Sequence, residues 1–200
     1  MDQKSRIIVL RCIKYGEADL IVHGIDTNGA RINFLAKSAL KSRKRFGGGV
    51  LEPTHYIDAV YRRPRSSSSE DPLYFLQEAR LVESFPGIRQ NYERLEMAFY
   101  FLKVISKVVQ EGAVEDSEDF LLLGRSLRAL EKAQDLLSLK TMFEIKVLHN
   151  HGVLPSDLQA HKYVKSPVSQ YQVHSPSRLE ERQALRGRVH HILAQYLNVN

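Results

Sequence analysis

The chain has 200 residues, of which 43% are hydrophobic and 26% charged, and its formal net charge is +6. This composition is ordinary for a globular protein, and the length suffices for one or two compact domains. The single cysteine, Cys12, excludes an internal disulfide and a zinc site built from four cysteines. No apolar run is long enough to span a bilayer and the N-terminus has no secretory signal, so we expect a soluble cytoplasmic protein.

Positive charge is concentrated in residues 1–80 and 161–200, whereas residues 81–160 contain more acids than bases. Such an asymmetry indicates a basic binding module joined to a more neutral scaffold. The basic module is therefore expected to bind an acidic partner.

The first 84 residues are predicted to form five short β-strands. β-branched runs, the hairpin signal Asn28-Gly29, and the alternation of Ile32, Phe34 and Ala36 with polar residues all support them. The predicted strands cover residues 7–13, 20–25, 30–36, 51–62 and 73–84. Because no helix lies between them, we expect a small Greek-key barrel, with the OB-fold as first choice and an SH3-like barrel as second. The predicted fold class is α+β, a five-stranded OB-fold β-barrel followed by an α-helical domain.

Residues 37–53, K-S-A-L-K-S-R-K-R-F-G-G-G-V-L-E-P, carry the strongest functional signal of this barrel. Five cations with no acid among them precede Phe46 and three glycines. Lysine and arginine neutralise phosphates, and glycine allows left-handed backbone angles and close approach to a ligand. We therefore expect a charged, pliable arm that projects from the barrel and holds nucleic acid. The alternative is a solvated loop whose charge only keeps the protein soluble.

The candidate phosphate-binding residues are cations of this segment, of its flanking strands and of the Ser/Pro-rich loop at residues 62–72. They are Arg31, Lys37, Lys41, Arg43, Lys44, Arg45, Arg62, Arg63 and Arg65. Few aromatics accompany them near the loops, namely Tyr15, Phe46 and Tyr56, so base stacking should contribute little. Binding is expected to depend weakly on base sequence and steeply on salt.

From Phe85 onward, apolar residues recur every three or four positions, which predicts amphipathic helices. The first of these helices is expected to bury Tyr92 and Phe99 among other apolar residues. The predicted helices cover residues 88–109, about 117–130, 136–151, and about 177 onward. Residues 160–177 contain Pro167 and Pro176, and we expect them to form a connector.

Arg178, Arg182 and Arg186 lie four residues apart on the last predicted helix and should form a cationic stripe. Two interpretations remain open for this stripe. It is either a solvated helix face or a second contact line for nucleic acid or for a partner's acidic tail.

Catalytic motifs are missing from the sequence. The acidic cluster Glu115, Asp116, Glu118 and Asp119 lies at a helix start, where acids favour the helix dipole. The glycines at 47–49 lack the G-K-[ST] ending of a nucleotide-binding loop. We therefore expect no enzyme and no cofactor, but either a nucleic-acid-binding protein or a protein-interaction scaffold whose basic charge is incidental.

Four segments stand out by their order and spacing. They are V-L-R-C-I-K-Y-G-E-A-D-L-I-V (9–22), A-K-S-A-L-K-S-R-K-R-F-G-G-G-V-L-E-P (36–53), E-A-R-L-V-E-S-F-P-G-I-R-Q (78–90) and F-E-I-K-V-L-H-N-H-G-V-L-P (143–155). In this arrangement the chain resembles the bacterial recombination mediator family RecO. The resemblance implies an OB-fold DNA-binding domain at residues 1–84 and an α-helical domain at residues 85–200.

The resemblance also implies a function in DNA repair and recombination. The family binds single- and double-stranded DNA, anneals complementary strands, and works with RecR to load RecA onto strands coated by single-strand-binding protein. The acidic C-terminal tail of that coating protein docks on the helical domain, for which we expect Arg125 and Arg128 beside Leu127 and Leu130. A nucleoid-associated protein in the cytoplasm, without membrane contact, is the expected setting.

One departure from the family is plain. Many members carry a four-cysteine zinc module after an L-L-x-x-G-x-x-P stretch, but residues 156–177 contain no cysteine here. We expect a variant that lacks the module, with the connector at 160–177 in its place. An alternative ligand set would have to come from His149, His151, His161, His174, His190 and His191. Structural zinc sites usually use thiolates, so we expect no metal.

Overall fold

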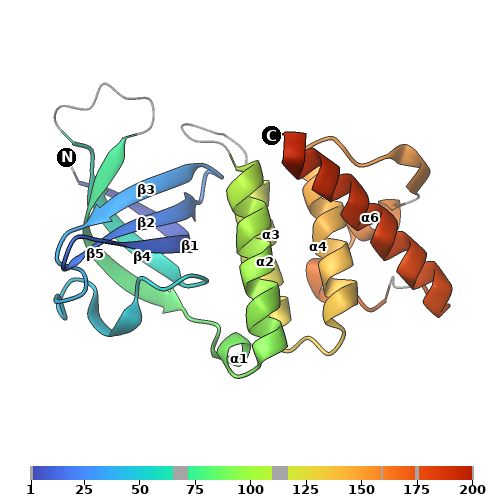
Figure 1. The fold of residues 1–200 in the computed structure, drawn as a ribbon, viewed down its shortest axis with the longest axis horizontal. Coiled ribbons are helices and arrows are strands. Elements are labelled where there is room, and N and C mark those ends of the chain that lie inside the picture. The colour runs from blue at the N-terminus through green and yellow to red at the C-terminus, as the bar shows by residue number, and fades with distance from the viewer. Residues whose placement is uncertain (1, 65–71, 110–116, 159, 174–175, 200) are drawn as a thin grey trace. The chain divides into compact units, whose positions relative to one another are not determined.

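The computed structural model describes the chain except for residues 1, 65–71, 110–116, 159, 174–175 and 200. The chain divides into two compact units, residues 1–85 with 109–121, and residues 86–108 with 122–200. The first unit contains a β-barrel and the second contains helices (Figure 1).

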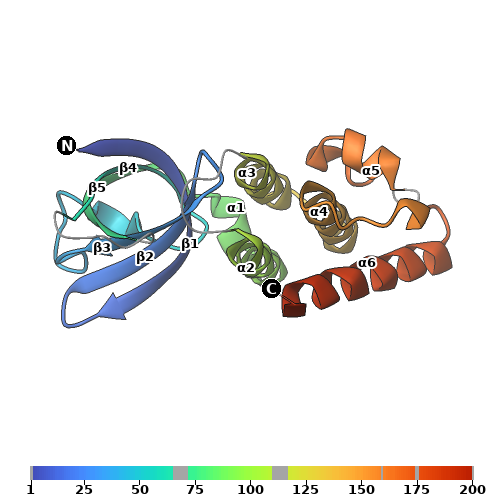
Figure 2. The same ribbon diagram turned by 90° about the horizontal axis from the view of Figure 1, so that it is seen from above.

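The barrel is built from β1 (Gln3–Tyr15), β2 (Asp19–Asp26), β3 (Arg31–Ala36), β4 (Tyr56–Arg62) and β5 (Leu73–Glu83). These strands close in the order β1-β2-β3-β5-β4, with β3 and β5 parallel and the other neighbours antiparallel (Figure 2). A closed five-stranded barrel followed by helices is the predicted OB-fold and α+β class.

β1 closes the barrel because it is long enough to pair with two strands. Ile7 is opposite Asp26 of β2 and also opposite Ile57 of β4. The Ile7 side chain lies so close to Gly24 that a Cβ atom there would be 2.3 Å from its Cγ2. Glycine is therefore required at this point of β2.

The predicted buried faces of the third and fourth strands are confirmed, although Asn33 of β3 is buried as well. Ile32, Phe34 and Ala36 of β3 are buried, and so are Ile57 and Tyr61 of β4. The strand predicted to begin at residue 51 begins instead at Tyr56. Thr54 has a φ of +78°, a left-handed conformation that interrupts extended structure. The N–H of Thr54 nevertheless donates to the Val9 carbonyl, so this turn stays joined to β1.

The helical unit is organised around α4 (Leu136–Asn150), most of whose side chains are buried. α2 (Tyr92–Val108), α5 (His161–Lys165) and α6 (Leu179–Val199) all contact α4. Figure 2 shows α5 and α6 on opposite sides of it. Phe101 of α2 stacks on Phe143 of α4 with 4.2 Å between ring centroids. α1 (Pro86–Arg89) and α3 (Glu118–Leu130) are the remaining α-helices among the described residues, and η2 (Ser156–Leu158) and η3 (Val168–Gln170) are short 3₁₀ turns.

Three helical predictions need correction. The helix expected at 88–109 is two helices, because the Asn91 side chain accepts the Arg94 N–H and begins α2 anew. Tyr92 and Phe99 are 78% and 48% exposed instead of buried, because α2 has more apolar residues than its buried face holds. The connector at 160–177 contains α5 and η3, whose Tyr163 and Val168 are buried. No described helix is both long enough and apolar enough to cross a membrane.

Cys12 lies in the barrel wall, where its Sγ donates a hydrogen bond of 2.8 Å to the Leu51 carbonyl. Burial, with the nearby charge of Glu52, raises the pKa of this thiol to about 12. The reactive thiolate is therefore scarce at neutral pH.

We predict that Cys12 reacts with a disulfide reagent such as DTNB at pH 8 at least about tenfold more slowly in the folded protein than in urea. The chain has one cysteine, so the absorbance change reports this thiol alone. Equal rates in the two states would contradict the burial described above.

Candidate nucleic-acid interface

Residues 37–50, called the basic loop below, are anchored in the barrel by apolar side chains. Ala39, Phe46 and Val50 are buried and belong to the same core cluster as Phe34 and Tyr61. A buried aromatic of this size contributes several kcal/mol to stability. The loop therefore packs along the barrel.

Backbone hydrogen bonds hold the basic loop on two sides. Leu40 N–H donates to the Ala18 carbonyl in the turn between β1 and β2, and the N–H of Ala79 in β5 donates to the Arg45 carbonyl, each over 3.0 Å. Gly48 and Gly49 have φ values of +70° and +77°, so they provide a tight turn. The expected pliable arm that projects from the barrel is therefore an anchored loop in this structure.

The cations of the basic loop point to solvent although its backbone is anchored. All five are exposed: Lys37, Lys41, Arg43, Lys44 and Arg45. Arg45 also donates to the Lys37 carbonyl over 2.8 Å and lies 5.1 Å from the Phe46 ring centre. Lys41, Arg43 and Lys44 form no ion pair with another described residue, so their charge is available to a ligand.

The remaining predicted phosphate ligands divide by position. Arg62 is opposite Phe75, whose ring lies 5.4 Å below the Lys37 ammonium, so Arg62 and Lys37 lie at the same end of the barrel. Arg63 follows Arg62 in the sequence and is also exposed. Arg31 is half-buried at the other end of β3, about 17 Å of strand away from Ala36. Arg65 lies outside the described residues.

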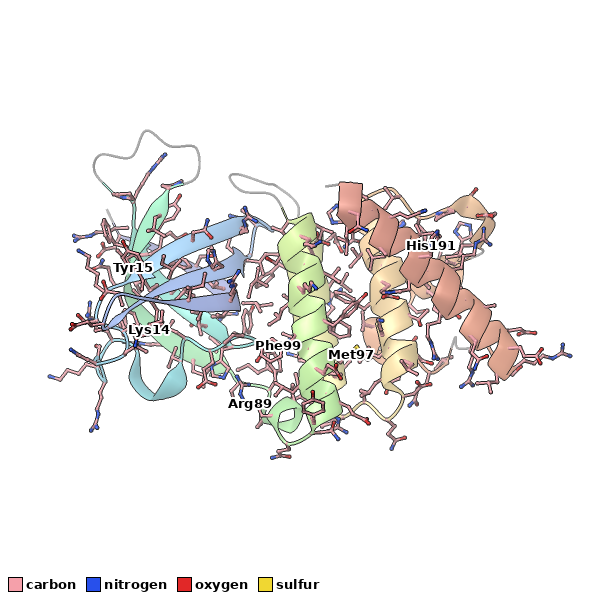
Figure 3. The ribbon with its side chains drawn as sticks, in the orientation of Figure 1. Lys14, Tyr15, Arg89, Met97, Phe99 and His191 are labelled. Atoms are coloured by element: carbon pink, nitrogen blue, oxygen red, sulfur yellow. The ribbon has the colours of Figure 1, made fainter. Side chains whose placement is uncertain are left out.

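Lys14, which is not among the predicted phosphate ligands, adds an exposed cation to this surface, and Tyr15 lies beside it. They end β1 next to the turn that is bonded to Leu40, and Figure 3 shows both at the barrel. Tyr15 is 57% exposed, whereas Phe46 is buried and Tyr56 half-buried. One exposed ring among three is consistent with binding that relies mainly on phosphates. In the sequence, the position of Lys14 and Tyr15 directly at the Y-G-E turn was the feature that could have indicated this site.

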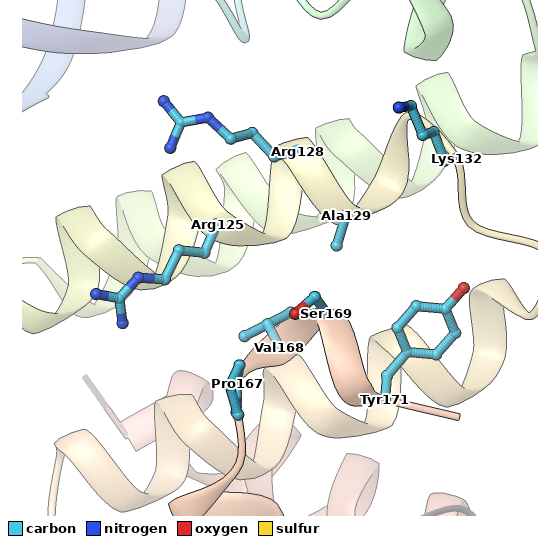
Figure 4. Close-up of a pocket in the computed structure, with 8 residues that line it drawn as sticks. All are labelled: Arg125, Arg128, Ala129, Lys132, Pro167, Val168, Ser169 and Tyr171. Carbon is cyan, nitrogen blue, oxygen red and sulfur yellow. The ribbon is translucent and has the colours of Figure 1, made fainter. Parts of the chain in front are cut away.

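A pocket of about 450 Å³ lies in the helical unit between α3 and η3 (Figure 4). Arg125, Arg128 and Lys132 form one wall, and the opposite wall includes Val168 and Tyr171. We call it the cationic pocket. Both arginines expected here line it, although Figure 4 shows the Arg128 side chain turned away from η3. Leu127 and Leu130 are fully buried and do not line it.

The arginines expected to form a stripe on the last helix are engaged within the helical unit. Arg182 lies 3.9 Å from Asp135 and donates to the Pro176 carbonyl, and Arg178 lies 3.9 Å from Glu181. Burial alone would raise the pKa of Asp135, but hydrogen bonds from Ser138 and the charges of Arg182 and Arg186 lower it overall. These contacts attach α6 to the start of α4.

Comparison with known proteins follows the same two-part division. A model described as Recombination protein O N terminal matches residues 1–85, and one described as Recombination protein O C terminal matches residues 89–198. The chain belongs to the RecO family. It is similar to proteins named DNA repair protein RecO from three bacteria. They are those of Alkaliphilus metalliredigens (31% identical over 153 residues, 76% of this chain and 59% of the relative), Desulfosudis oleivorans (32% over 152 residues, 76% and 56%) and Rubrobacter xylanophilus (33% over 153 residues, 76% and 58%). The chain thus spans just under three fifths of the length of these RecO relatives.

The zinc module expected of many RecO proteins has no counterpart in the part of the chain that the structure describes. No three His, Cys, Asp or Glu side chains gather there as metal ligands. His174 lies outside the described residues. His190 contacts Glu144, and Glu118 and Asp119 occupy the first turn of α3, where they favour the helix dipole.

We predict that Phe46→Ala lowers the free energy of unfolding by about 3–5 kcal/mol, because it removes a ring from the barrel core. Leu40→Ala is the control, since Leu40 is 53% exposed in the same loop and should change stability by about 0.5 kcal/mol or less. Chemical denaturation measures both. A free arm would instead tolerate both substitutions equally.

Proposed function

We propose that this chain is a recombination mediator in DNA repair. It binds single- and double-stranded DNA through the barrel, anneals complementary strands, and with RecR helps to load RecA onto strands coated by single-strand-binding protein. The chemistry is association, so the site needs charge and shape but no catalytic group. Membership of the RecO family supports the assignment.

One observation carries the DNA-binding part of the proposal. Lys41, Arg43 and Lys44 are exposed and unpaired among the described residues, on a loop whose backbone is fixed by buried anchors. Fixed cations of this kind neutralise phosphates and release counterions whatever the base sequence. Lys37 and Arg62 extend the same positive surface toward β5.

Annealing needs two polyanions to approach each other while their bases remain free to pair. A surface that holds phosphates meets both needs, whereas a channel that stacked every base would block pairing. The burial of Phe46 removes one of the rings that could have stacked, and its neighbouring cations remain outside. The basic loop therefore suits strand annealing better than tight storage of a single strand.

The cationic pocket is the proposed site for the acidic tail of single-strand-binding protein. An acidic tail that ends in an apolar residue needs an apolar cavity with cations around it. Arg125, Arg128 and Lys132 provide the cations, and Val168 and Tyr171 provide apolar contact. This pocket replaces the neighbourhood of Leu127 and Leu130 that the sequence had suggested.

We predict that Lys41→Ala/Arg43→Ala/Lys44→Ala weakens single-strand binding and flattens its dependence on salt. Three lost phosphate contacts should reduce the slope of log K against log salt by about 2. Fluorescence anisotropy over a salt series measures it. Lys103→Ala/Lys107→Ala, which removes two exposed cations of α2, is the matched control and should keep the original slope.

The same triple variant should anneal complementary strands more slowly than the control variant does. An unchanged salt slope would remove the basic loop from the interface. If neither DNA binding nor annealing is found in the unmodified protein, an interaction scaffold with incidental charge becomes the better description.

We predict that Arg125→Gln/Arg128→Gln weakens binding of an acidic peptide with an apolar C-terminal residue by about five- to tenfold. Each lost contact is a partly screened ion pair, which limits the size of the effect. Titration of a labelled peptide measures it. Equal affinity in the variant would exclude the cationic pocket, and loss of DNA binding by the same variant would show a wider defect.

A further inference from the structure

A second pocket of the helical unit, of about 490 Å³, lies between α2 and the first turns of α4. We call it the acidic pocket, because Glu93 and Glu96 line it. Its size is typical of cavities that receive side chains or small ligands. It shares no lining residue with the cationic pocket, and the proposed function does not use it.

The apolar lining of the acidic pocket is open to solvent. Met97 lies on the side of α2 that faces α4 (Figure 3), and Leu137 on α4 is 46% exposed. Burying such surface in a complex is favourable, by roughly 25 cal/mol per Å². Methionine also adapts its shape to different apolar partners. The pocket therefore favours an occupant that brings an apolar side chain.

Lys140 is the one cation among the described residues that lines the acidic pocket, and its charge is already balanced. Its ammonium lies 3.7 Å from the carboxylate of Glu144 and 4.4 Å from the centre of the Tyr100 ring. The Lys140 side chain is only 20% exposed. Lys140 therefore does not neutralise the charges of Glu93 and Glu96 at the rim.

Glu144 lies behind the acidic pocket and fixes two of its lining residues, Lys140 and Tyr100. Its side chain is fully buried, and Oε1 accepts hydrogen bonds from the Tyr100 hydroxyl and from His190. Its second oxygen, Oε2, has no hydrogen-bond partner among the described residues. The Tyr100 hydroxyl, whose pKa is raised by burial and by the charge of Glu144, remains a donor that fixes the ring as a pocket wall.

Glu93 and Glu96 are exposed at the rim and have no hydrogen bond or ion pair with another described residue. Glu93 lies in the first turn of α2, where the helix dipole favours it, but Glu96 lies beyond that turn. Two unpaired carboxylates repel phosphates and attract cations. The pocket is thus unsuited to DNA, to an anionic membrane, or to the acidic tail proposed for the cationic pocket.

We propose that the acidic pocket binds a segment of a partner protein in which an apolar side chain is flanked by lysine or arginine. The apolar side chain enters between Met97 and Leu137, and the flanking cations reach Glu93 and Glu96. The helical unit then carries two docking sites of opposite charge preference. Each selects its peptide by the sign of the charges around an apolar anchor.

The three methionines of the chain allow a direct test in the full protein. With ¹³C-methyl methionine labelling, Met97 reports on the acidic pocket and the fully buried Met142 serves as an internal control. A Met97→Leu variant assigns the signal. The probe is a synthetic peptide with one leucine between two pairs of lysines. We expect it to shift the Met97 signal and to leave the Met142 signal in place.

Matched peptides and variants separate the proposal from general charge attraction. Glu93→Gln/Glu96→Gln should weaken the lysine–leucine peptide about fivefold, whereas Arg125→Gln/Arg128→Gln should leave its affinity unchanged. A peptide with serine in place of leucine should bind at least fivefold more weakly. Circular dichroism and thermal unfolding check that both variants fold.

Several results would overturn the proposal. They are an unmoved Met97 signal, equal affinity for the serine peptide, equal affinity in the glutamine variant, or the same Met97 shift with a peptide carrying glutamate in place of lysine. A Met97 shift with single-stranded DNA would mark the pocket as part of the nucleic-acid interface instead. None of these results bears on the salt-dependence experiment for the basic loop.

Discussion

Burial of Phe46 in the barrel core determines how this protein presents its positive charge. With Ala39 and Val50, it holds the basic loop against the strands, and the hydrogen bonds to Ala18 and Ala79 hold the loop from both sides. Lysines and arginines between these anchors cannot follow them into the core, because burying an unpaired charge costs far more than burying a ring. Apolar anchors and solvent-facing cations in one segment give a charged surface of defined shape.

The helical unit presents two distinct pockets on a small number of helices. α4 is buried along most of its length and supports α2, α5 and α6, so that side chains on the neighbours are left to form pockets. The cationic pocket uses α3 and η3, and the acidic pocket uses α2 and the start of α4. The two pockets differ in charge because different charged residues lie on the helix faces that are not buried in the core.

The sequence predicted those features that depend on a short repeat. Strand alternation placed Ile32, Phe34 and Ala36 correctly, since a period of two leaves one choice of buried face. It could not place Tyr92 and Phe99, because they lie on the same helical stripe as the exposed Glu96 and Lys103, and tertiary packing decides which stripe is buried. Nor could it distinguish Phe46 as an anchor from Phe46 as a stacking ring, because both roles suit an aromatic beside glycines. Leu127 and Leu130 follow the arginines closely in sequence, but a helix turns such neighbours to different faces, and both leucines are buried.

The shared carboxylate of Glu144 limits how far the helical unit can be shortened. One oxygen of this fully buried side chain is contacted by Tyr100 from α2, Lys140 from α4 and His190 from α6. A fragment that ended before α6 would lose His190 together with the buried Val189 and Leu193. It would then hold an acid in an apolar interior with fewer donors and open one side of α4 to water. The last helix thus covers one side of the core, and a shortened protein for biophysical work has to retain it.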